Sequence, residues 1–345
     1  MKKDIRTLSL AELQHEIVSI GEKSFRVNQI QEWLWNKSAT SFDDMSNLSV
    51  KLRGHLNDHF EIRPVELSTT QSSSDSTIKS SFRLHDDKLV EGVLIPRKSR
   101  MTACISSQVG CSLSCKFCAT GYLERQRNLD AAEIYDQVVL IRKQAKENYD
   151  SPLTNIVFMG MGEPLLNYKN VMTAISHITS PKGLGIASKR ITLSTAGISK
   201  MIKKLADDKV KVKLALSIHA ANDEKRNQIM PVNETNSLSS LAEALQYYYN
   251  NTKNFITFEY IIFKDFNDDL RDAEELFRFI RKFQCKVNII EYNPIDQAQF
   301  ENTSSEKLEA FAAYLENKNV VVKVRRSRGK DIDAACGQLA NKEVK

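Results

Sequence analysis

Three cysteines stand close together at Cys111, Cys115 and Cys118, with the spacing Cys-x3-Cys-x2-Cys. Thiolates at this spacing can bind three irons of a four-iron cubane cluster and leave the fourth iron open to another ligand. A structural zinc site would instead need a fourth protein ligand, and Cys104 is the best local residue for that role. The spacing therefore favours an iron–sulfur cluster, with a zinc site as the alternative.

Two further cysteines have different surroundings. Cys336 lies in the small-residue stretch Ala-Ala-Cys-Gly, shortly after a run of basic side chains. Small neighbours admit a bulky substrate, and nearby positive charge favours the reactive thiolate. Cys285 precedes an apolar strand and is interpreted as a packing residue. The first residues lack the apolar stretch of a secretory signal, so we expect a cytoplasmic protein whose thiols stay reduced.

A glycine-rich turn and several strand-end residues accompany the cysteines. In Gly-Met-Gly-Glu-Pro (160–164), Gly162 lets backbone carbonyls approach an ammonium group, and Glu163 can pair with that group. Because the chemistry of parallel α/β sheets gathers at the carboxyl ends of the strands, we expect residues at strand ends to share one rim with this turn. The strand-end residues are Ser194, Ser217, Ile218, His219 and Asn293.

The elements that would position these residues alternate regularly from residue 102 onward. Short apolar runs are separated by segments with helical spacing, which predicts a parallel sheet with helices outside. Seven strands and six helices are too few for an eight-fold barrel, so the predicted fold is α/β, an incomplete (βα)6-type barrel. The predicted strands cover 102–105, 155–159, 190–193, 212–218, 255–262, 287–292 and 320–324, and the helices cover 131–146, 168–178, 198–205, 238–249, 270–283 and 305–317.

Composition divides the chain into three parts. Residues 1–65 have apolar residues at helical spacing and hold both tryptophans, which predicts a small helical accessory domain. Residues 66–98 contain β-type runs and the Ser/Thr-rich stretch 67–79, which predicts a linker and a β-hairpin. Residues 99–345 would form the partial barrel and a C-terminal catalytic tail.

Charge is unevenly distributed along the chain. The whole chain has a net charge of +6, whereas residues 97–127 alone carry +5 and residues 320–345 carry +4. Two basic stretches on a mildly acidic body indicate a polyanionic partner such as nucleic acid. No run of about 18 apolar residues occurs, so we expect no membrane span. The side chains that could hold phosphates are Arg97, Lys98, Arg100, Arg125, Arg127, Arg325, Arg326, Arg328 and Lys330.

The cysteine loop after the first strand of a partial barrel resembles the radical S-adenosylmethionine (SAM) superfamily. Six motifs, in order along the chain, resemble more narrowly the RlmN-type dual-specificity RNA methyltransferases. They are Cys-Ile-Ser-Ser-Gln-Val-Gly-Cys (104–111), Phe-Cys-Ala-Thr-Gly (117–121), Met-Gly-Met-Gly-Glu-Pro-Leu-Leu-Asn (159–167), Ile-Thr-Leu-Ser-Thr-Ala-Gly (191–197), Ser-Ile-His-Ala (217–220) and Asp-Ile-Asp-Ala-Ala-Cys-Gly-Gln-Leu (331–339).

This resemblance implies one [4Fe-4S] cluster on the three clustered cysteines and two SAM molecules per turnover. It implies that Cys336 carries a methyl group as S-methylcysteine, and that Cys104 resolves the adduct through a transient disulfide with Cys336. Glu91 matches a family position proposed as proton acceptor. The SAM contacts that the resemblance implies are Gly162, Glu163, Ser194, Ser217, Ile218, His219 and Asn293.

The implied activity is methylation of C2 of an adenine in the peptidyl-transferase loop of 23S rRNA and, in some members, of an anticodon-loop adenine of tRNA. Adenine C2 has no lone pair and cannot attack the SAM methyl group, so a radical route is required. The resemblance also implies an electron donor such as flavodoxin, and we expect a monomer. Two alternatives stay open, a resistance-type methylase acting on C8 of the same rRNA base and a zinc RNA-binding module. Residues 164–167 and 194–197 favour C2.

Overall fold

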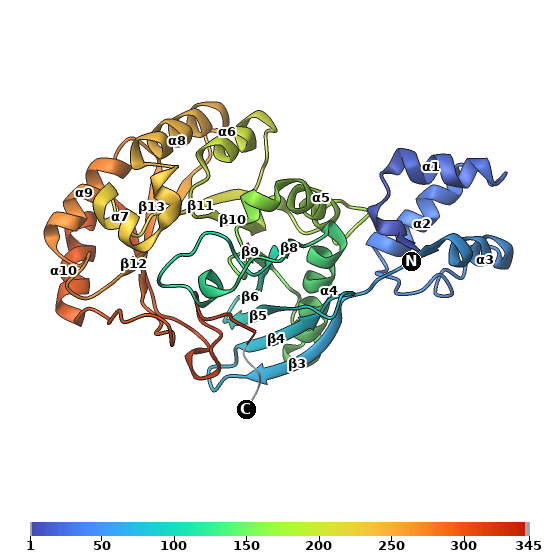
Figure 1. The fold of residues 1–345 in the computed structure, drawn as a ribbon, viewed down its shortest axis with the longest axis horizontal. Helices are drawn as coiled ribbons and strands as arrows, with labels where there is room; N and C mark the ends of the chain where they lie inside the picture. The colour runs from blue at the N-terminus through green and yellow to red at the C-terminus, as the bar shows by residue number, and fades with distance from the viewer. Residues whose placement is uncertain (1, 342–345) are drawn as a thin grey trace.

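The computed structural model describes residues 2–341, so Lys342 and Lys345 of the basic C-terminal stretch lie outside the described residues. Its centre is one ten-stranded sheet (Figure 1). Seven strands pair in parallel, as predicted. They are β6 (Arg100–Ile105), β9 (Asn155–Phe158), β10 (Ile191–Thr195), β11 (Lys213–Ser217), β12 (Ile256–Ile262), β13 (Cys285–Glu291) and β14 (Val321–Arg325).

Three antiparallel strands extend this sheet: β3 (Glu66–Ser72), β4 (Ile78–Arg83) and β5 (Leu89–Arg97). The strand order is β14-β13-β12-β11-β10-β9-β6-β5-β4-β3. Within the described residues β14 and β3 do not pair, so the barrel is incomplete, as predicted. The Ser/Thr-rich stretch expected as a linker or hairpin loop is strand at both ends, because its hydroxyl side chains suit a half-exposed edge strand. Only residues 73–77 form the turn.

Six predicted helices connect successive parallel strands and cover the outside of the sheet (Figure 1). Strand β12 is buried along its whole length because helices pack outside and side chains fill the inside. A seventh helix, α7 (Asp223–Ile229), was not predicted, because its sequence is almost entirely polar. The six helices are α4 (Ala131–Tyr149), α5 (Tyr168–Thr179), α6 (Ser199–Asp207), α8 (Leu238–Thr252), α9 (Leu270–Ile280) and α10 (Ser305–Glu316).

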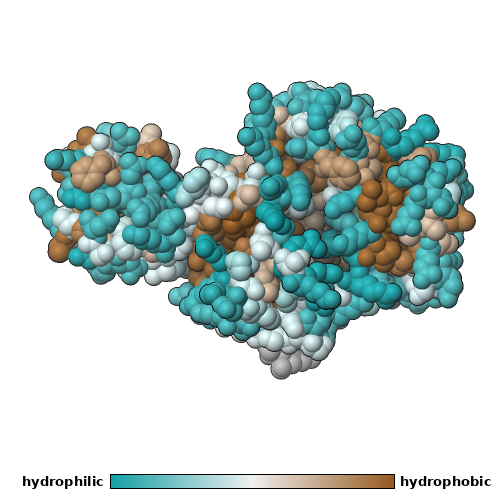
Figure 2. Space-filling model, turned by 180° about the vertical axis from the view of Figure 1, so that it is seen from behind, coloured by the Kyte–Doolittle hydropathy of each residue, from teal (hydrophilic) through white to brown (hydrophobic). Residues whose placement is uncertain are grey.

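The first sixty residues form a separate small domain of three helices, α1 (Leu10–Ser19), α2 (Phe25–Trp35) and α3 (Val50–His59). It stands at one end of the molecule, beside α4 and α5 (Figures 1 and 2). Trp35 at the end of α2 stacks on His177 of α5, with ring centroids 3.7 Å apart. In the described part of the chain, no helix is long and apolar enough to cross a membrane.

After β14 the chain runs back across the open side of the barrel as residues 326–341, here called the Cys336 segment (Figure 1). Its only regular element within the described residues is the 3-10 helix η6 (Lys330–Ile332). The Arg328 guanidinium donates to the Pro96 carbonyl at the end of β5, 3.1 Å away. The segment therefore connects the β14 edge of the sheet to its antiparallel part.

Candidate active site

The three clustered cysteines lie on a loop between β7 (Gln108–Val109) and the 3-10 helix η2 (Ala119–Tyr122). The Leu123 carbonyl accepts from the Cys111 amide at 3.3 Å, and the Cys115 carbonyl accepts from the Cys118 amide at 3.2 Å. All three side chains are partly exposed. The thiol of Cys115 is within electrostatic reach of both other thiols, so the loop gathers three sulfurs at one place.

The surroundings of these thiols disfavour the free thiolate through burial and favour it through nearby donors and positive charge. Burial raises the pKa of Cys111 to about 11 and raises those of Cys115 and Cys118. Opposing this, the amides of Gly121 and Thr120 donate toward Cys118, and the Arg226 guanidinium lowers the pKa of Cys115.

Within residues 2–341, no group of three or more His, Cys, Asp or Glu side chains is arranged around the position of a single metal ion. A cubane distributes its protein ligands over different irons, and metal binding displaces the thiol proton. Three thiols on one loop, with amide and guanidinium groups around them, are the donor set that such a cluster uses.

Glu163 lies beside the cysteine loop at the end of β9 and is buried. Its two carboxylate oxygens accept from the amides of Leu165 (3.0 Å) and Ala196 (2.7 Å). Burial raises the pKa of Glu163 to about 7, although these amides lower it. Gly162 precedes it at φ +89°, and a Cβ there would lie 2.5 Å from the Gln108 Cβ, so glycine is required. The turn thus presents a buried carboxyl group at the rim, as the sequence predicted.

The strand-end residues share this rim but differ in what they offer a ligand. Ser194, the next-to-last residue of β10, is buried, and Ser217 ends β11 partly exposed. Ile218 is buried. The His219 Nδ1 already accepts from the Ile261 amide at 2.9 Å, its ring packs edge-on against Phe117, and burial lowers its pKa to about 3. His219 therefore supports the cysteine loop as a neutral ring.

Asn293 joins the rim to the Cys336 segment. Its Nδ2 donates to the Cys336 carbonyl at 3.1 Å, while its buried Oδ1 has no hydrogen-bond partner among the described residues. A buried acceptor without a partner is costly unless a ligand or water satisfies it. Asn293 is therefore placed to contact both the segment and a bound molecule.

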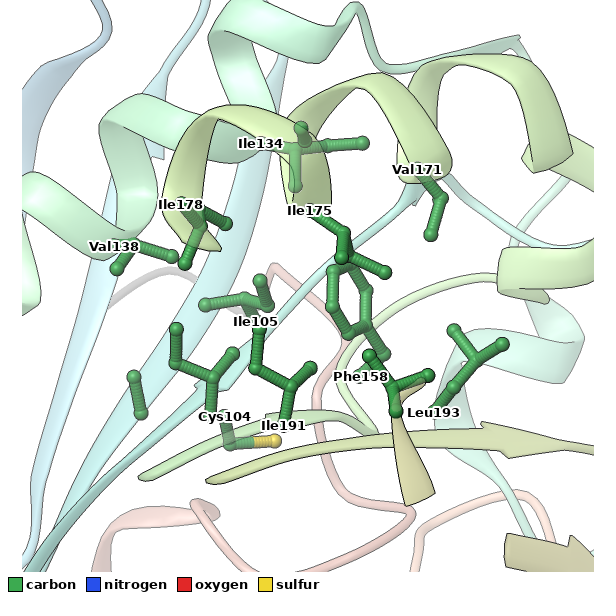
Figure 3. Close-up of a cluster of buried hydrophobic side chains, with 14 of the residues drawn as sticks. Cys104, Ile105, Ile134, Val138, Phe158, Val171, Ile175, Ile178, Ile191 and Leu193 are labelled. Carbon is green, nitrogen blue, oxygen red and sulfur yellow. The ribbon is translucent and has the colours of Figure 1, made fainter. Parts of the chain in front are cut away.

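The structure brings Cys104 and Cys336 together from opposite ends of the chain. On β6, Ile105 points toward α4 and α5, whereas the sulfur of Cys104 points away from them, toward the inside of the barrel (Figure 3). Cys336 is exposed as a residue, although burial of its thiol raises the pKa of that group. A charge on Cys336 raises the pKa of Cys104, beyond the larger effect of burial, and Cys118 is within electrostatic reach of Cys336. Cys336 thus lies within electrostatic reach of both Cys104 and the cysteine loop.

Arg325 lies within electrostatic reach of both thiols, which the sequence did not predict. Its guanidinium lies 3.4 Å from the Glu259 carboxylate and acts electrostatically on both Cys104 and Cys336. It lowers the pKa of each, although burial raises both more strongly. Glu259 in turn accepts from Asn288 Nδ2 at 2.7 Å. Arg325, which we expected to hold RNA phosphates, therefore has an internal partner.

Arg127 is a second basic residue with internal partners. Its guanidinium binds the carboxylates of Asp86 and Glu133 at 2.8 Å each. Arg326, by contrast, approaches Glu291 only at 3.7 Å and leaves 85% of its side chain exposed. The net charge of a segment does not show which of its basic residues have internal partners, because the partner carboxylates lie on other elements of the fold.

Glu91, the expected proton acceptor, is buried on β5 and holds the end of the Cys336 segment. Its Oε2 accepts from the amides of Ala340 (2.8 Å) and Asn341 (3.1 Å). Its Oε1 lies 3.6 Å from the ammonium group of the buried Lys79. Glu91 therefore lies close to the reactive segment, with both oxygens engaged.

Comparisons with known proteins show which families this chain resembles. Residues 3–62 match the model of the ribosomal RNA large subunit methyltransferase N-terminal domain, and residues 105–280 match that of the radical SAM superfamily. The chain is 62% identical over 344 residues to a probable dual-specificity RNA methyltransferase RlmN from Cytophaga hutchinsonii, covering 100% of this chain and 94% of that one.

A relative of the same description from Christiangramia forsetii is 58% identical, covering 99% of this chain and 97% of that one. Among solved structures, a radical SAM methyltransferase from Sphaerobacter thermophilus matches with a TM-score of 0.92 and 38% identity. That match covers 99% of this chain and 100% of that one.

Proposed function

This chain belongs to the RlmN family of radical SAM RNA methyltransferases, and we propose that it methylates adenine C2 in 23S rRNA through Cys336 and Cys104. Membership of the family implies a [4Fe-4S] cluster and SAM as cofactors. We extend the proposal to tRNA as a second substrate, because the relatives are described as dual-specificity RNA methyltransferases.

Separate residues of the chain would bind the cluster and SAM. The three clustered cysteines would hold the cluster, which when bound supplies electrons to cleave SAM. Glu163 would pair with the ammonium group of SAM, and Asn293 Oδ1 supplies a further acceptor. Ser194, Ser217 and neighbouring backbone groups line the same rim.

Cys336 and Cys104 would carry the methyl group and release the product. The carbon delivered from Cys336 to C2 stays bonded to the Cys336 sulfur until Cys104 attacks that sulfur. This attack forms the S–S bond and breaks the C–S bond. Glu91 is the proposed acceptor of the C2 proton. The observation that carries the proposal is the meeting of Cys104, Cys336 and Arg325 beside the cysteine loop.

RNA would approach across the open side of the barrel, where exposed basic residues such as Arg326 remain available for phosphates. The target base must leave its stack to reach the thiols inside the rim. A flavodoxin would supply electrons, and the chain would act as a monomer.

Two cysteine variants test this proposal. Cys336→Ala should keep the iron–sulfur cluster but transfer no methyl group to RNA. Cys104→Ala should stall before release and leave protein attached to RNA through Cys336, seen as a nuclease-sensitive shifted band. The double variant should lose that band. Normal turnover by Cys104→Ala would contradict the assignment, and mapping the product methyl group to C8 would contradict the C2 assignment.

A further inference from the structure

The Cys336 segment has little regular structure, so its position depends on contacts with other parts of the chain. On the side that follows Cys336, contacts come from η2, which directly follows the cysteine loop, and from Glu91. The Ala119 amide donates to the Gly337 carbonyl at 2.7 Å, and the Thr120 hydroxyl donates to the Leu339 carbonyl at 2.6 Å. These bonds hold the exit of the segment against the cluster site.

On the side that precedes Cys336, the contacts come from the turn between β3 and β4, residues 73–77, here called the hairpin turn. The Ser73 hydroxyl donates to Asp331 Oδ1 at 2.5 Å, and the Ser74 amide donates to Asp331 Oδ2 at 2.9 Å. In return, the Gly329 amide donates to Asp75 Oδ2 at 3.0 Å. The Cys336 segment thus supplies Asp331, which accepts from a backbone amide of the hairpin turn. The hairpin turn supplies Asp75, which accepts from a backbone amide of the segment.

The two elements also approach closely. Gly329 has φ +67°, and a Cβ there would lie 2.7 Å from the Ala334 Cβ and 3.1 Å from Thr77 Cγ2. A side chain at this position would separate the segment from the hairpin turn. The hydrogen bond from Ser73 is the largest effect on Asp331 and lowers the pKa of that carboxyl, so Asp331 stays charged near neutral pH.

The hairpin turn has its own internal order, which makes it a firm support. The Thr77 amide donates to Asp75 Oδ1 at 3.0 Å, and the Asp75 amide donates to the Ser73 Oγ at 3.2 Å. The turn belongs to the same ten-stranded sheet that carries Cys104 on β6. Its position relative to Cys104 is therefore set by strand pairing.

We propose that Asp75 and Asp331 are positioning residues, through which the hairpin turn holds Cys336 at the distance from Cys104 and the cluster that methyl transfer requires. This inference rests on the proposed function, in which Cys336 carries the methyl group. Only four residues lie between Asp331 and Cys336, so releasing Asp331 weakens the hold of the hairpin turn on the reactive thiol, while the Gly329–Asp75 hydrogen bond and the exit-side contacts remain. Small misplacements of reacting groups cost large factors in rate.

The first test uses the ligand-free chain. In Asp331→Ala and Asp75→Ala, trypsin should cleave after Lys330 several-fold faster than in the unchanged chain. Asp87→Ala, which alters an exposed aspartate in the turn between β4 and β5, should not change the rate. Ser73→Ala removes one donor to Asp331 and should give a smaller increase in the cleavage rate. This variant replaces an aspartate variant that fails to fold. Unchanged cleavage in all these variants would overturn the proposal.

The second test uses the chain with its cluster. Asp331→Ala should retain the cluster and cleave SAM, yet the ratio of 5′-deoxyadenosine formed to RNA methylated should rise by roughly tenfold or more. KM for RNA should stay unchanged. An unchanged ratio would overturn the proposal. Absence of methylated Cys336 from the mass spectrum of the unchanged chain would instead contradict the proposed function, so the two failures are distinguishable.

Discussion

At the scale of single residues, two carboxyl groups of the same residue type differ in their charge partners, and this difference affects which ligand each can bind. Glu163 and Glu91 are both buried carboxyl groups near the cluster site. Glu91 pairs with Lys79, whereas Glu163 meets only neutral donors, and burial raises its pKa to about 7. A cationic ligand such as the SAM ammonium group would supply the positive charge that Glu163 lacks.

We predict that SAM binds the cluster-loaded protein more weakly as the pH falls from 8 to 6. A protonated Glu163 cannot pair with the ammonium group, so affinity should fall by up to about tenfold per pH unit below the pKa. Calorimetric titration at several pH values would measure this. Glu163→Gln should bind weakly at every pH, and Glu124→Gln, which alters an exposed carboxylate after the cysteine loop, should behave as the unchanged chain does. A pH dependence that persists in Glu163→Gln would contradict the assignment.

Glu163 also predicts how stability varies with pH in the ligand-free chain. Because its folded-state pKa lies above its usual value of 4.5, the folded state binds the proton more tightly than the unfolded chain. Its contribution is therefore complete below about pH 4.5 and is lost as the pH rises toward 7, by roughly 3 kcal/mol. Urea unfolding should show that Glu163→Gln lacks this decline, and an equal decline in both proteins would show that another group causes it.

At the scale of elements, the short helix α7 connects the ends of the strands that form the rim. Its Arg226 is fully buried and donates to the carbonyls of Ile218 (3.0 Å) and Ala196 (2.6 Å) and to Asn233 Oδ1 (2.6 Å). The same guanidinium lies within electrostatic reach of Cys115. One side chain thus orders two strand ends and places positive charge beside the cluster loop.

We predict that Arg226→Met lowers the free energy of unfolding by about 3 kcal/mol or more, because several buried acceptors lose their donor. Urea unfolding of the ligand-free protein would measure this. Arg278→Met, which alters a largely exposed arginine on α9, should change stability little. Iron content after reconstitution should also fall in Arg226→Met. Equal stability of both variants would show that the Arg226 hydrogen bonds contribute little.

At the scale of the whole molecule, the accessory domain has a defined orientation on the barrel. Besides the stacking of Trp35 on His177, Asn36 donates to the Gly183 carbonyl at 2.9 Å. Arg6 binds Asp136 of α4 at 2.8 Å. These contacts fix the distance between the accessory domain and the rim, which matters if both bind one RNA molecule.

We predict that His177→Ala raises KM for RNA by roughly tenfold, because the accessory domain loses a fixed orientation and the RNA must supply it. SAM cleavage without RNA should stay unchanged, since the rim is distant in the fold. Ser176→Ala, an exposed neighbour on α5, serves as the control. Steady-state kinetics with an rRNA fragment would measure both. An unchanged KM would show that the domain orientation does not depend on this stacking contact.

The sequence by itself determined what depends on short spacing. The Cys111–Cys118 loop, the alternation of strands and helices and the Gly162–Glu163 turn all follow from neighbours in the chain, and the structure confirms the elements that carry them. The pairing of Cys104 with Cys336 followed from family resemblance. Local spacing has no means of showing it, since 232 positions separate the two residues.

Only the tertiary structure decided which charges are paired. Arg325 and Arg326 are adjacent in the sequence, yet Arg325 pairs with Glu259 and leaves 34% of its side chain exposed, whereas Arg326 pairs with Glu291 at 3.7 Å and leaves 85% exposed. Likewise, nothing in the sequence indicates that Asp331 accepts a hydrogen bond from Ser73. Partners of this kind come from strands distant along the chain, and sheet order brings them together. Composition records how many charges a segment has, whereas the fold determines which of them have partners.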